Sequence, residues 1–130
     1  MSKRIGKVIK PSNTKPWLHE ELIADILAEA GYCVEFLPRN SSLPDILLDG
    51  KFYEMKSPRS HKMNSMEQLI KDALYKKKCP NIVFDSLRLK GARDERIESF
   101  LISQAKKRKA IKSLLFVNRH RKIIDICKLV

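Results

Sequence analysis

The chain has 130 residues, enough for one domain with a single hydrophobic core but too few for two. Its apolar fraction of 43% excludes wholesale disorder, and no apolar run reaches membrane-spanning length, which excludes stable membrane insertion. The charge is unusual, because 27 Lys and Arg residues against 15 Asp and Glu residues give +12. This charge favours a polyanionic partner, with nucleic acid expected ahead of an acidic protein or a membrane surface.

The first part of the chain predicts a tail and then a helix. Residues 1–15 are basic and end in a polar, proline-containing run, so we expect a tail or linker before one domain over 16–130. Apolar or small residues recur at helical spacing from 18 to 30 and stop at Gly31. This spacing predicts an amphipathic helix with a glycine at its C-terminal cap.

The remaining patterns complete an α/β order. After a strand over 33–37, the stretch "PDILLDGKFYEMK" predicts a β-hairpin turning at Asp49 and Gly50, since Asp-Gly is a strong hairpin signal. Further elements are a helix over 64–77, a strand over 81–87, a helix over 93–110 and a hairpin of strands 112–118 and 122–129. The order α-β-β-β-α-β-α-β-β predicts one α/β domain with a central mixed sheet and helices on both faces.

The register of the first hairpin brings charged residues together. A two-residue Asp-Gly turn sets Leu47 opposite Phe52, and two pairs further on it sets Asp45 opposite Glu54. Lys56 lies two residues beyond Glu54, so strand alternation points it to the same face. We expect Leu47 and Phe52 to continue that face as part of the core.

Two carboxylates directly opposite each other repel, and burial increases the cost. A divalent cation between Asp45 and Glu54 would offset the repulsion, and Lys56 would then orient or deprotonate a water or stabilise charge on phosphorus. A surface sheet end is an equal alternative, in which Asp45 caps a turn and Glu54 and Lys56 pair in solvent. The hairpin alone leaves the two readings open.

A third carboxylate comes from the first helix. Glu20 shares its stripe with Ala24 and Leu27, which predicts that it faces inward and needs a partner. Stabilisation of the helix N-terminus is an alternative role that requires no active site. Trp17, just before this helix, is expected to pack against the core.

Further polar residues follow the motif strand. Ser57, Arg59 and His61 leave the strand beside the predicted site, where they would contact phosphate or form a solvated loop. His61 could also act as an acid or base in metal-free RNA cleavage. Basic clusters at 75–78, 106–109 and 119–122 would grip an RNA backbone if they share one face, whereas helix ends also favour basic residues for dipole reasons.

These residues resemble a known family. A helix glutamate, then Pro44-Asp45, eight intervening residues and Glu54-Met55-Lys56 look like the PD-(D/E)xK nuclease superfamily, whose core has the α-β-β-β-α-β order. The wider arrangement "HEELIADILAEAGYCVEFLP", "LPDILLDGKFYEMKSP" and "CPNIVFDSL" resembles the C-terminal toxin domains of contact-dependent growth inhibition (CdiA) proteins, in their tRNA nuclease group. The resemblance covers about residues 17–127.

The resemblance implies a restriction-endonuclease-like fold and cleavage of tRNA phosphodiester bonds. It implies Glu20, Asp45 and Glu54 as the acidic, metal-holding residues and Lys56 as the catalytic lysine. The expected ion is magnesium, with manganese or zinc as alternatives. It also implies delivery as part of a larger secreted toxin, action in the cytoplasm of a target cell and neutralisation by a cognate immunity protein.

One departure concerns the lysine. Some related toxins use a lysine on the following helix, and this chain also carries Lys71 there, on a polar stripe with Gln68 and Tyr75. We favour Lys56 as catalytic and expect Lys71, Gln68 and Tyr75 to contact substrate. A DNA endonuclease or resolvase of the same fold, and a non-catalytic nucleic-acid-binding module, are the alternative functions. The oligomeric state stays open.

Overall fold

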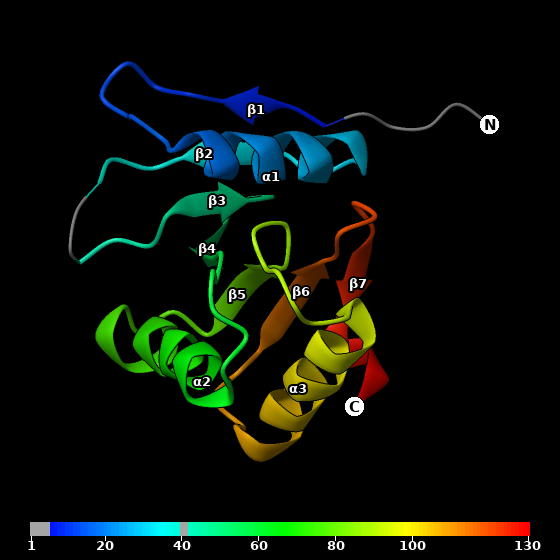
Figure 1. The fold of residues 1–130 in the computed structure, drawn as a ribbon. Helices are drawn as coiled ribbons and strands as arrows, with labels where there is room; N and C mark the ends of the chain where they lie inside the picture. Colours follow the sequence, from blue (N-terminus) through cyan, green and yellow to red (C-terminus); the bar gives the residue numbers. More distant parts are fainter. Residues whose placement is uncertain (1–5, 40–41) are drawn as a thin grey trace.

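The computed structural model describes residues 6–39 and 42–130 and shows an α/β domain built on a mixed sheet of seven strands in that part of the chain (Figure 1). The strands are β1 (Val8–Ile9), β2 (Val34–Phe36), β3 (Ile46–Leu48), β4 (Lys51–Lys56), β5 (Asn81–Asp85), β6 (Ser113–Val117) and β7 (Ile123–Asp125). The helices are α1 (Leu18–Glu29), α2 (Met63–Lys71) and α3 (Asp94–Lys107), with a π-helical turn at Asp72–Lys76 and a 3-10 turn at Ile126–Leu129.

The strands lie side by side in chain order. β4, β5 and β6 run parallel, so the chain crosses over through α2 between the first two and through α3 between the second two. The pairs β2–β3, β3–β4 and β6–β7 are antiparallel hairpins. The predicted α/β class and element order are therefore confirmed from α1 onward.

β1 was not predicted. It pairs in parallel with β2, with Val8 opposite Val34, and the Gly6 amide donates to the Ala28 carbonyl at 2.8 Å. A side chain at Gly6 would collide with the Tyr32 carbonyl oxygen, which explains the glycine. Part of the segment expected to be a tail or linker thus belongs to the sheet. Residues 1–5 of that segment lie outside the described residues, and the boundary at residue 16 stays a prediction.

The sheet carries a separate core on each face. Strand alternation sends Ile82 and Phe84 to the face covered by α2 and α3, and Val83 to the face covered by α1. β6 repeats the pattern, with Leu114 on the first face and Leu115 on the second. Figure 1 shows α1 on one side of the sheet and α2 and α3 on the other, as the sequence predicted.

The first hairpin has the predicted register. Ile46 pairs with Tyr53 and Leu47 with Phe52, and the turn residues Asp49 and Gly50 both adopt positive φ angles, 49° and 81°. The face was assigned wrongly, however, because Phe52 is 49% exposed and Leu47 is only partly buried.

The buried residues of this hairpin are the alternate ones. They are Ile46, Leu48, Tyr53 and Met55. Alternation identifies two faces but cannot say which helix covers which. Here α1 covers the hairpin on the face opposite to Leu47 and Phe52. Glu54 and Lys56 therefore lie on the sheet face that carries α2.

The helix predicted over 64–77 begins as α2 and widens into a π-helical turn. Met66, Ile70 and Ala73 are fully buried, as their helical stripe predicted. The π turn ends at Lys76, and Lys77 then donates to the Leu43 carbonyl at 3.1 Å. This contact fixes the end of the helix against the loop that leads into β3.

Candidate active site

Asp45 and Glu54 lie beside each other at the open end of the β3–β4 hairpin. The ladder stops one residue short of them, at the pair Ile46 and Tyr53. The Asp45 carboxylate bends back over β4 and accepts a hydrogen bond from the Met55 amide at 2.8 Å. The predicted juxtaposition of the two carboxylates is therefore present, with Asp45 just outside the strand.

Glu54 is the most deeply buried carboxyl group of the pair, with 2% of the residue exposed. Burial, the charge of Asp45 and a hydrogen bond shared with it raise the pKa of Glu54 to about 7. Its Oε1 atom is buried and has no hydrogen-bond partner among residues 6–39 and 42–130. An unsatisfied oxygen on a buried carboxyl group is costly, which marks the position as one that a ligand would satisfy.

Lys56 joins the pair from the same strand face. Its Nζ atom lies 3.4 Å from Glu54 Oε2, and 16% of its side chain is exposed. A hydrogen bond from Gln68 is the main cause that holds the pKa of Asp72, at the start of the π turn, below its usual range. The charge of Lys56 acts on Asp72 in the same direction. The solvated sheet end considered above is excluded for Glu54 and Lys56, because their ion pair is buried.

Glu20 approaches from the other side of the hairpin. Its carboxylate accepts a hydrogen bond from the Trp17 amide at 2.8 Å and pairs with Arg39 at 3.2 Å. Burial raises the pKa of Glu20, and the Asp45 charge acts in the same direction. Glu20 thus faces inward near Asp45 as predicted, and it also stabilises the N-terminus of α1, so both expected roles are compatible with its position.

Asp45 and Glu20 open onto a pocket of about 380 Å³. It lies between the start of α1, the segments flanking the β2–β3 loop, and the end of the π turn. Its lining residues are Lys15, Pro16, Glu20, Phe36, Leu37, Pro38, Arg39, Leu43, Pro44, Asp45 and Lys77. Three of these are basic, so the pocket combines carboxylates on one wall with positive charge around them, as an anionic substrate would require.

Histidine and arginine side chains that sequence reasoning missed add to this positive surrounding. His19 is partly buried, and burial and the charges of Arg88, Arg59 and Arg39 lower the pKa of its imidazole, while the Asp45 charge opposes them. Arg39 comes from a loop and Arg88 follows β5, so no pattern in the sequence relates them to the motif.

Ser57 extends the site toward β5 in a way the sequence did not predict. Its hydroxyl donates to the buried Asp85 carboxylate, and its carbonyl accepts from Arg88 at 2.5 Å. Burial raises the pKa of Asp85 to about 6, although Ser57 opposes the shift. Lys56 pairs with Phe84 in the parallel ladder, so the next residues, Ser57 and Asp85, are neighbours. In the sequence, the only signal for this contact was the acidic residue Asp85 at the end of an apolar strand.

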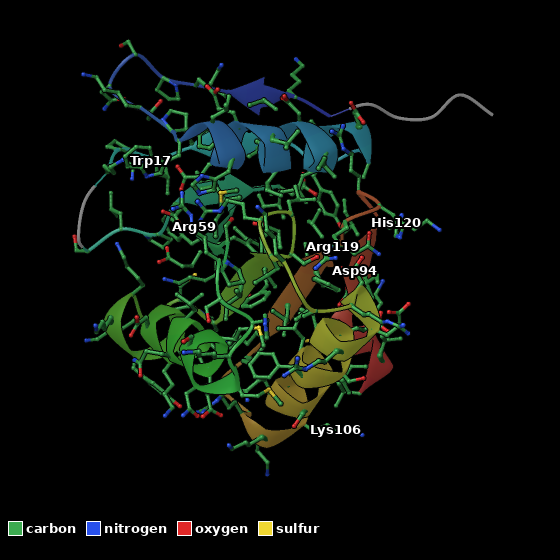
Figure 2. All side chains as sticks on the ribbon, viewed as in Figure 1. Trp17, Arg59, Asp94, Lys106, Arg119 and His120 are labelled. Carbon is green, nitrogen blue, oxygen red and sulfur yellow. The ribbon has the colours of Figure 1, made fainter. Side chains whose placement is uncertain are left out.

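Arg59 and His61 lie on the segment after β4. Arg59 is exposed and lies below α1 in Figure 2, and its charge adds to the burial that lowers the pKa of His19 on that helix. His61 is partly buried and packs near Gly91, where an added Cβ would lie 3.3 Å from His61 Nε2. His61 therefore lies against the loop after β5.

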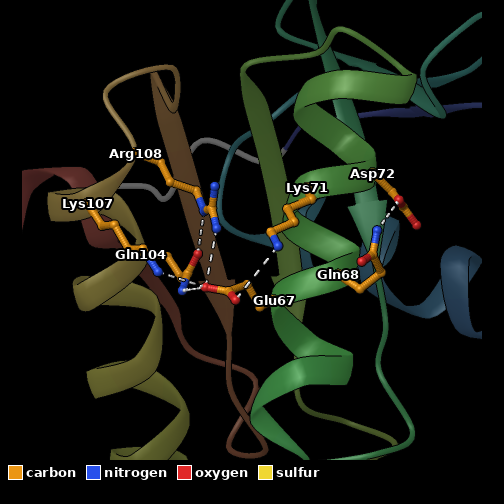
Figure 3. A network of polar contacts seen from close by, with 7 residues as sticks. All are labelled: Glu67, Gln68, Lys71, Asp72, Gln104, Lys107 and Arg108. Carbon is orange, nitrogen blue, oxygen red and sulfur yellow. Dashed lines mark hydrogen bonds and ion pairs between the residues drawn. The ribbon is translucent and has the colours of Figure 1, made fainter.

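Gln68, Lys71 and Tyr75 lie along α2 and its π turn. Gln68 donates to Asp72 at 2.9 Å, and Tyr75 is 57% exposed. Lys71 lies 4.0 Å from Glu67, within a network that joins α2 to α3 (Figure 3). Lys56 is thus the lysine that contacts the carboxylate pair, whereas Lys71 pairs with Glu67 in the network between α2 and α3.

The carboxylates offer two ligands for a hard cation. Asp45 and the unsatisfied oxygen of Glu54 fit such an ion, because magnesium binds one or two protein carboxylates and completes its shell with water and phosphate oxygens. Over residues 6–39 and 42–130, no three His, Cys, Asp or Glu side chains converge closely enough to hold a metal. The role of Glu20 as a third ligand stays a prediction.

Fold and site together define an α/β domain with a buried carboxyl group beside a second carboxylate and a lysine at a basic pocket. A family model described as "Contact-dependent growth inhibition CdiA C-terminal domain" matches residues 42–123. Since this match spans more than half of the sequence, the chain belongs to the family of CdiA C-terminal domains. The resemblance to that family is confirmed, and the wider PD-(D/E)xK assignment stays a prediction.

A solved structure has the same fold. It is the CdiA-CT/CdiI toxin and immunity complex from Burkholderia pseudomallei, which matches with a TM-score of 0.73 and 17% sequence identity. The match covers 92% of this chain and 98% of that chain. No curated protein sequence matches the chain. Among the described residues, no helix is long and apolar enough to cross a membrane.

Proposed function

We propose that this domain is a nuclease toxin that cleaves tRNA in a target bacterial cell, after delivery as part of a larger CdiA protein. The observation that carries the proposal is the Glu54 carboxyl group, which is buried beside Asp45, raised in pKa to about 7 and paired with Lys56. Burying a carboxyl group beside a second one costs stability, and phosphodiester cleavage requires acidic and basic groups at one position, which supports a catalytic role for this arrangement.

In this proposal Asp45 and Glu54 hold a divalent ion, with magnesium expected. When bound, the ion supplies a Lewis acid that polarises a phosphoryl oxygen and lowers the pKa of water. Lys56, 3.4 Å from Glu54, orients the attacking water or stabilises the charge that develops on phosphorus. Arg59 and the pocket residue Arg39 bind flanking phosphates, since guanidinium groups match phosphate geometry.

A cognate immunity protein is the proposed inhibitor. Family membership supports this partner, as does the fold shared with a toxin that was solved in complex with its immunity protein. The net charge of +12 makes an acidic surface on that partner the expected complement.

The activity is tested by incubating the purified chain with total tRNA and with plasmid DNA, each with magnesium and with a chelator. We expect magnesium-dependent tRNA cleavage that falls by about 10²-fold or more in Lys56→Ala, the range lost with a general acid or base. Lys71→Ala should lose far less activity, because Lys71 faces Glu67.

Lys112→Ala is the matched control, since it removes an exposed lysine with no assigned role. Thermal melts of all variants establish that they remain folded. Intact tRNA beside degraded plasmid would replace the proposed substrate with DNA. If Asp45→Asn and Lys56→Ala kept full toxicity, the chain would be a binding module.

A further inference from the structure

Trp17 is exposed although tryptophan is among the most apolar side chains. Its residue is 59% accessible, and the sequence prediction that it packs in the core is wrong. It occupies the N-cap position of α1, where residues with a side-chain oxygen are favoured. The hydrogen bond to Glu20 at this N-terminus comes from the backbone amide of Trp17, so capping of α1 does not require the indole ring.

Arg39 covers part of the indole ring. Its guanidinium carbon lies 4.7 Å from the ring centroid, a cation–π contact. The same guanidinium donates to the Lys15 carbonyl at 3.0 Å and to Glu20 at 3.2 Å, so its position is held by three contacts. The Arg39 side chain is nevertheless 54% exposed. Trp17 and Arg39 together form a fixed, open aromatic and cationic surface.

This surface adjoins the candidate active site. Arg39 lines the pocket that Asp45 opens onto, and so do Lys15 and Pro16, which directly precede Trp17. Figure 2 shows Trp17 near the start of α1 and Arg59 below the same helix. RNA that enters this pocket would therefore also meet the surface formed by Trp17 and Arg39.

We infer that Trp17 and Arg39 form a stacking platform for an unpaired nucleobase next to the cleaved bond. Proteins bind single-stranded RNA by stacking splayed-out bases on aromatic rings and guanidinium planes, with basic groups on the backbone. The inference rests on the proposed function for the class of substrate. It adds that the domain selects an unpaired segment, because a paired base has no free face to offer Trp17.

The test uses Trp17 itself, since it is the only tryptophan in the chain. The Lys56→Ala variant is titrated with a short oligoadenylate and with an abasic ribose-phosphate oligomer of equal length and charge. We expect the oligoadenylate to quench the tryptophan fluorescence and to bind about tenfold more tightly, as one stacked base contributes. Equal affinities without base-dependent quenching would overturn the inference.

Variants locate the effect. In Trp17→Ala, labelled oligoadenylate should bind about tenfold more weakly while the abasic oligomer is unaffected, and Trp17→Phe should restore most of the difference. Leu18→Ala is the matched control, because Leu18 is the next residue and 81% exposed. Unchanged discrimination between the two oligomers in a folded Trp17→Ala variant would also overturn the inference.

The outcome is separable from that of the proposed function. Base-dependent quenching without any tRNA cleavage by the unmodified chain would support the stacking platform and contradict the proposed nuclease activity. Cleavage without base-dependent quenching would leave the nuclease and remove the platform.

Discussion

The Glu54 carboxyl group links the candidate site to the stability of the domain. Its pKa is about 7 in the folded chain and near the ordinary glutamate value of 4.5 in the unfolded chain. Between these values the folded state holds a proton that the unfolded state has lost, so stability falls as the pH rises through this window. Above about pH 7 the full cost of the buried charge is present.

Replacing this carboxyl group should therefore stabilise the protein in a pH-dependent way. Glu54→Gln removes the charge, and we expect its Tm to exceed that of the unmodified chain by several degrees at pH 8. The two Tm values should approach each other at pH 5, where Glu54 is already protonated in the folded chain. Thermal melts at the two pH values measure the gap.

Glu29→Gln is the control for this experiment, since it neutralises an exposed carboxylate at the end of α1. A gap that is as large at pH 5 as at pH 8 would contradict the assignment of the raised pKa to Glu54.

How far the site could be predicted depends on how each residue arrives there. Asp45, Glu54 and Lys56 are related by a two-residue turn, so counting along the hairpin was enough to bring them together. Arg39 and Asp85 arrive from a loop and from a parallel strand. No periodic pattern in the sequence relates these two residues to the motif, because only tertiary packing brings them close to it.

At the scale of elements, α2 and α3 are joined by the carboxylate of Glu67. It accepts hydrogen bonds from Gln104 at 3.0 Å and Lys107 at 3.1 Å and pairs with Arg108 at 3.2 Å (Figure 3). These donors, Gln104 first, lower the pKa of Glu67 to about 2. The network holds together the two helices that cover one face of the sheet.

Glu67→Gln should weaken this link. We expect its Tm at pH 7 to fall by a few degrees, because three donors lose a charged acceptor. A depressed pKa contributes stability above the unfolded value of about 4.5 and loses it as the pH falls toward 2. The deficit of the variant should therefore shrink below about pH 4.5 in thermal melts.

A narrower substitution grades the effect. Lys107→Gln removes one contact and should lower Tm less than Glu67→Gln does. A deficit of Glu67→Gln that stayed constant down to pH 3 would show that the carboxylate charge is not what joins the helices.

The long helices were predictable from their periodicity. α1 and α3 run for 12 and 14 residues, long enough for a stripe of apolar side chains to repeat several times. β1 has two residues, too few for a period to be visible. The π turn continues the apolar stripe of α2 with buried Ala73 and Leu74, so periodicity does not distinguish it from that helix. The buried face of the first hairpin was predicted wrongly, because the sequence does not show which helix packs against which face of the hairpin.

At the scale of the whole molecule, two of the predicted basic clusters lie apart from each other. Figure 2 shows Lys106 at the far end of α3, away from Arg59, and His120 beside Arg119 and Asp94 at the other end of that helix. The predicted clusters at 106–109 and 119–122 therefore lie at opposite ends of α3. Arg39, which belongs to none of the clusters, lines the pocket with Asp45, and Lys77 of the 75–78 cluster lines it too.

Charge near the site should therefore matter more than charge at the end of α3. We expect Arg59→Ala, in the Lys56→Ala background, to weaken tRNA binding and to reduce the slope of log affinity against log salt by roughly one. Lys106→Ala should change both only slightly. Binding measured over a range of salt concentrations makes the comparison, and equal losses from the two variants would contradict it.

β1 has a consequence for how the molecule behaves among its own copies. It occupies the border of the sheet beside β2, whose backbone would otherwise present unpaired amide and carbonyl groups. Such borders recruit further strands and lead to aggregation. A chain that lacks residues 1–10 should keep its carboxylate pair but self-associate, which size-exclusion chromatography would detect. The two residues of β1 thus protect the edge of β2 from pairing with strands of other copies of the chain.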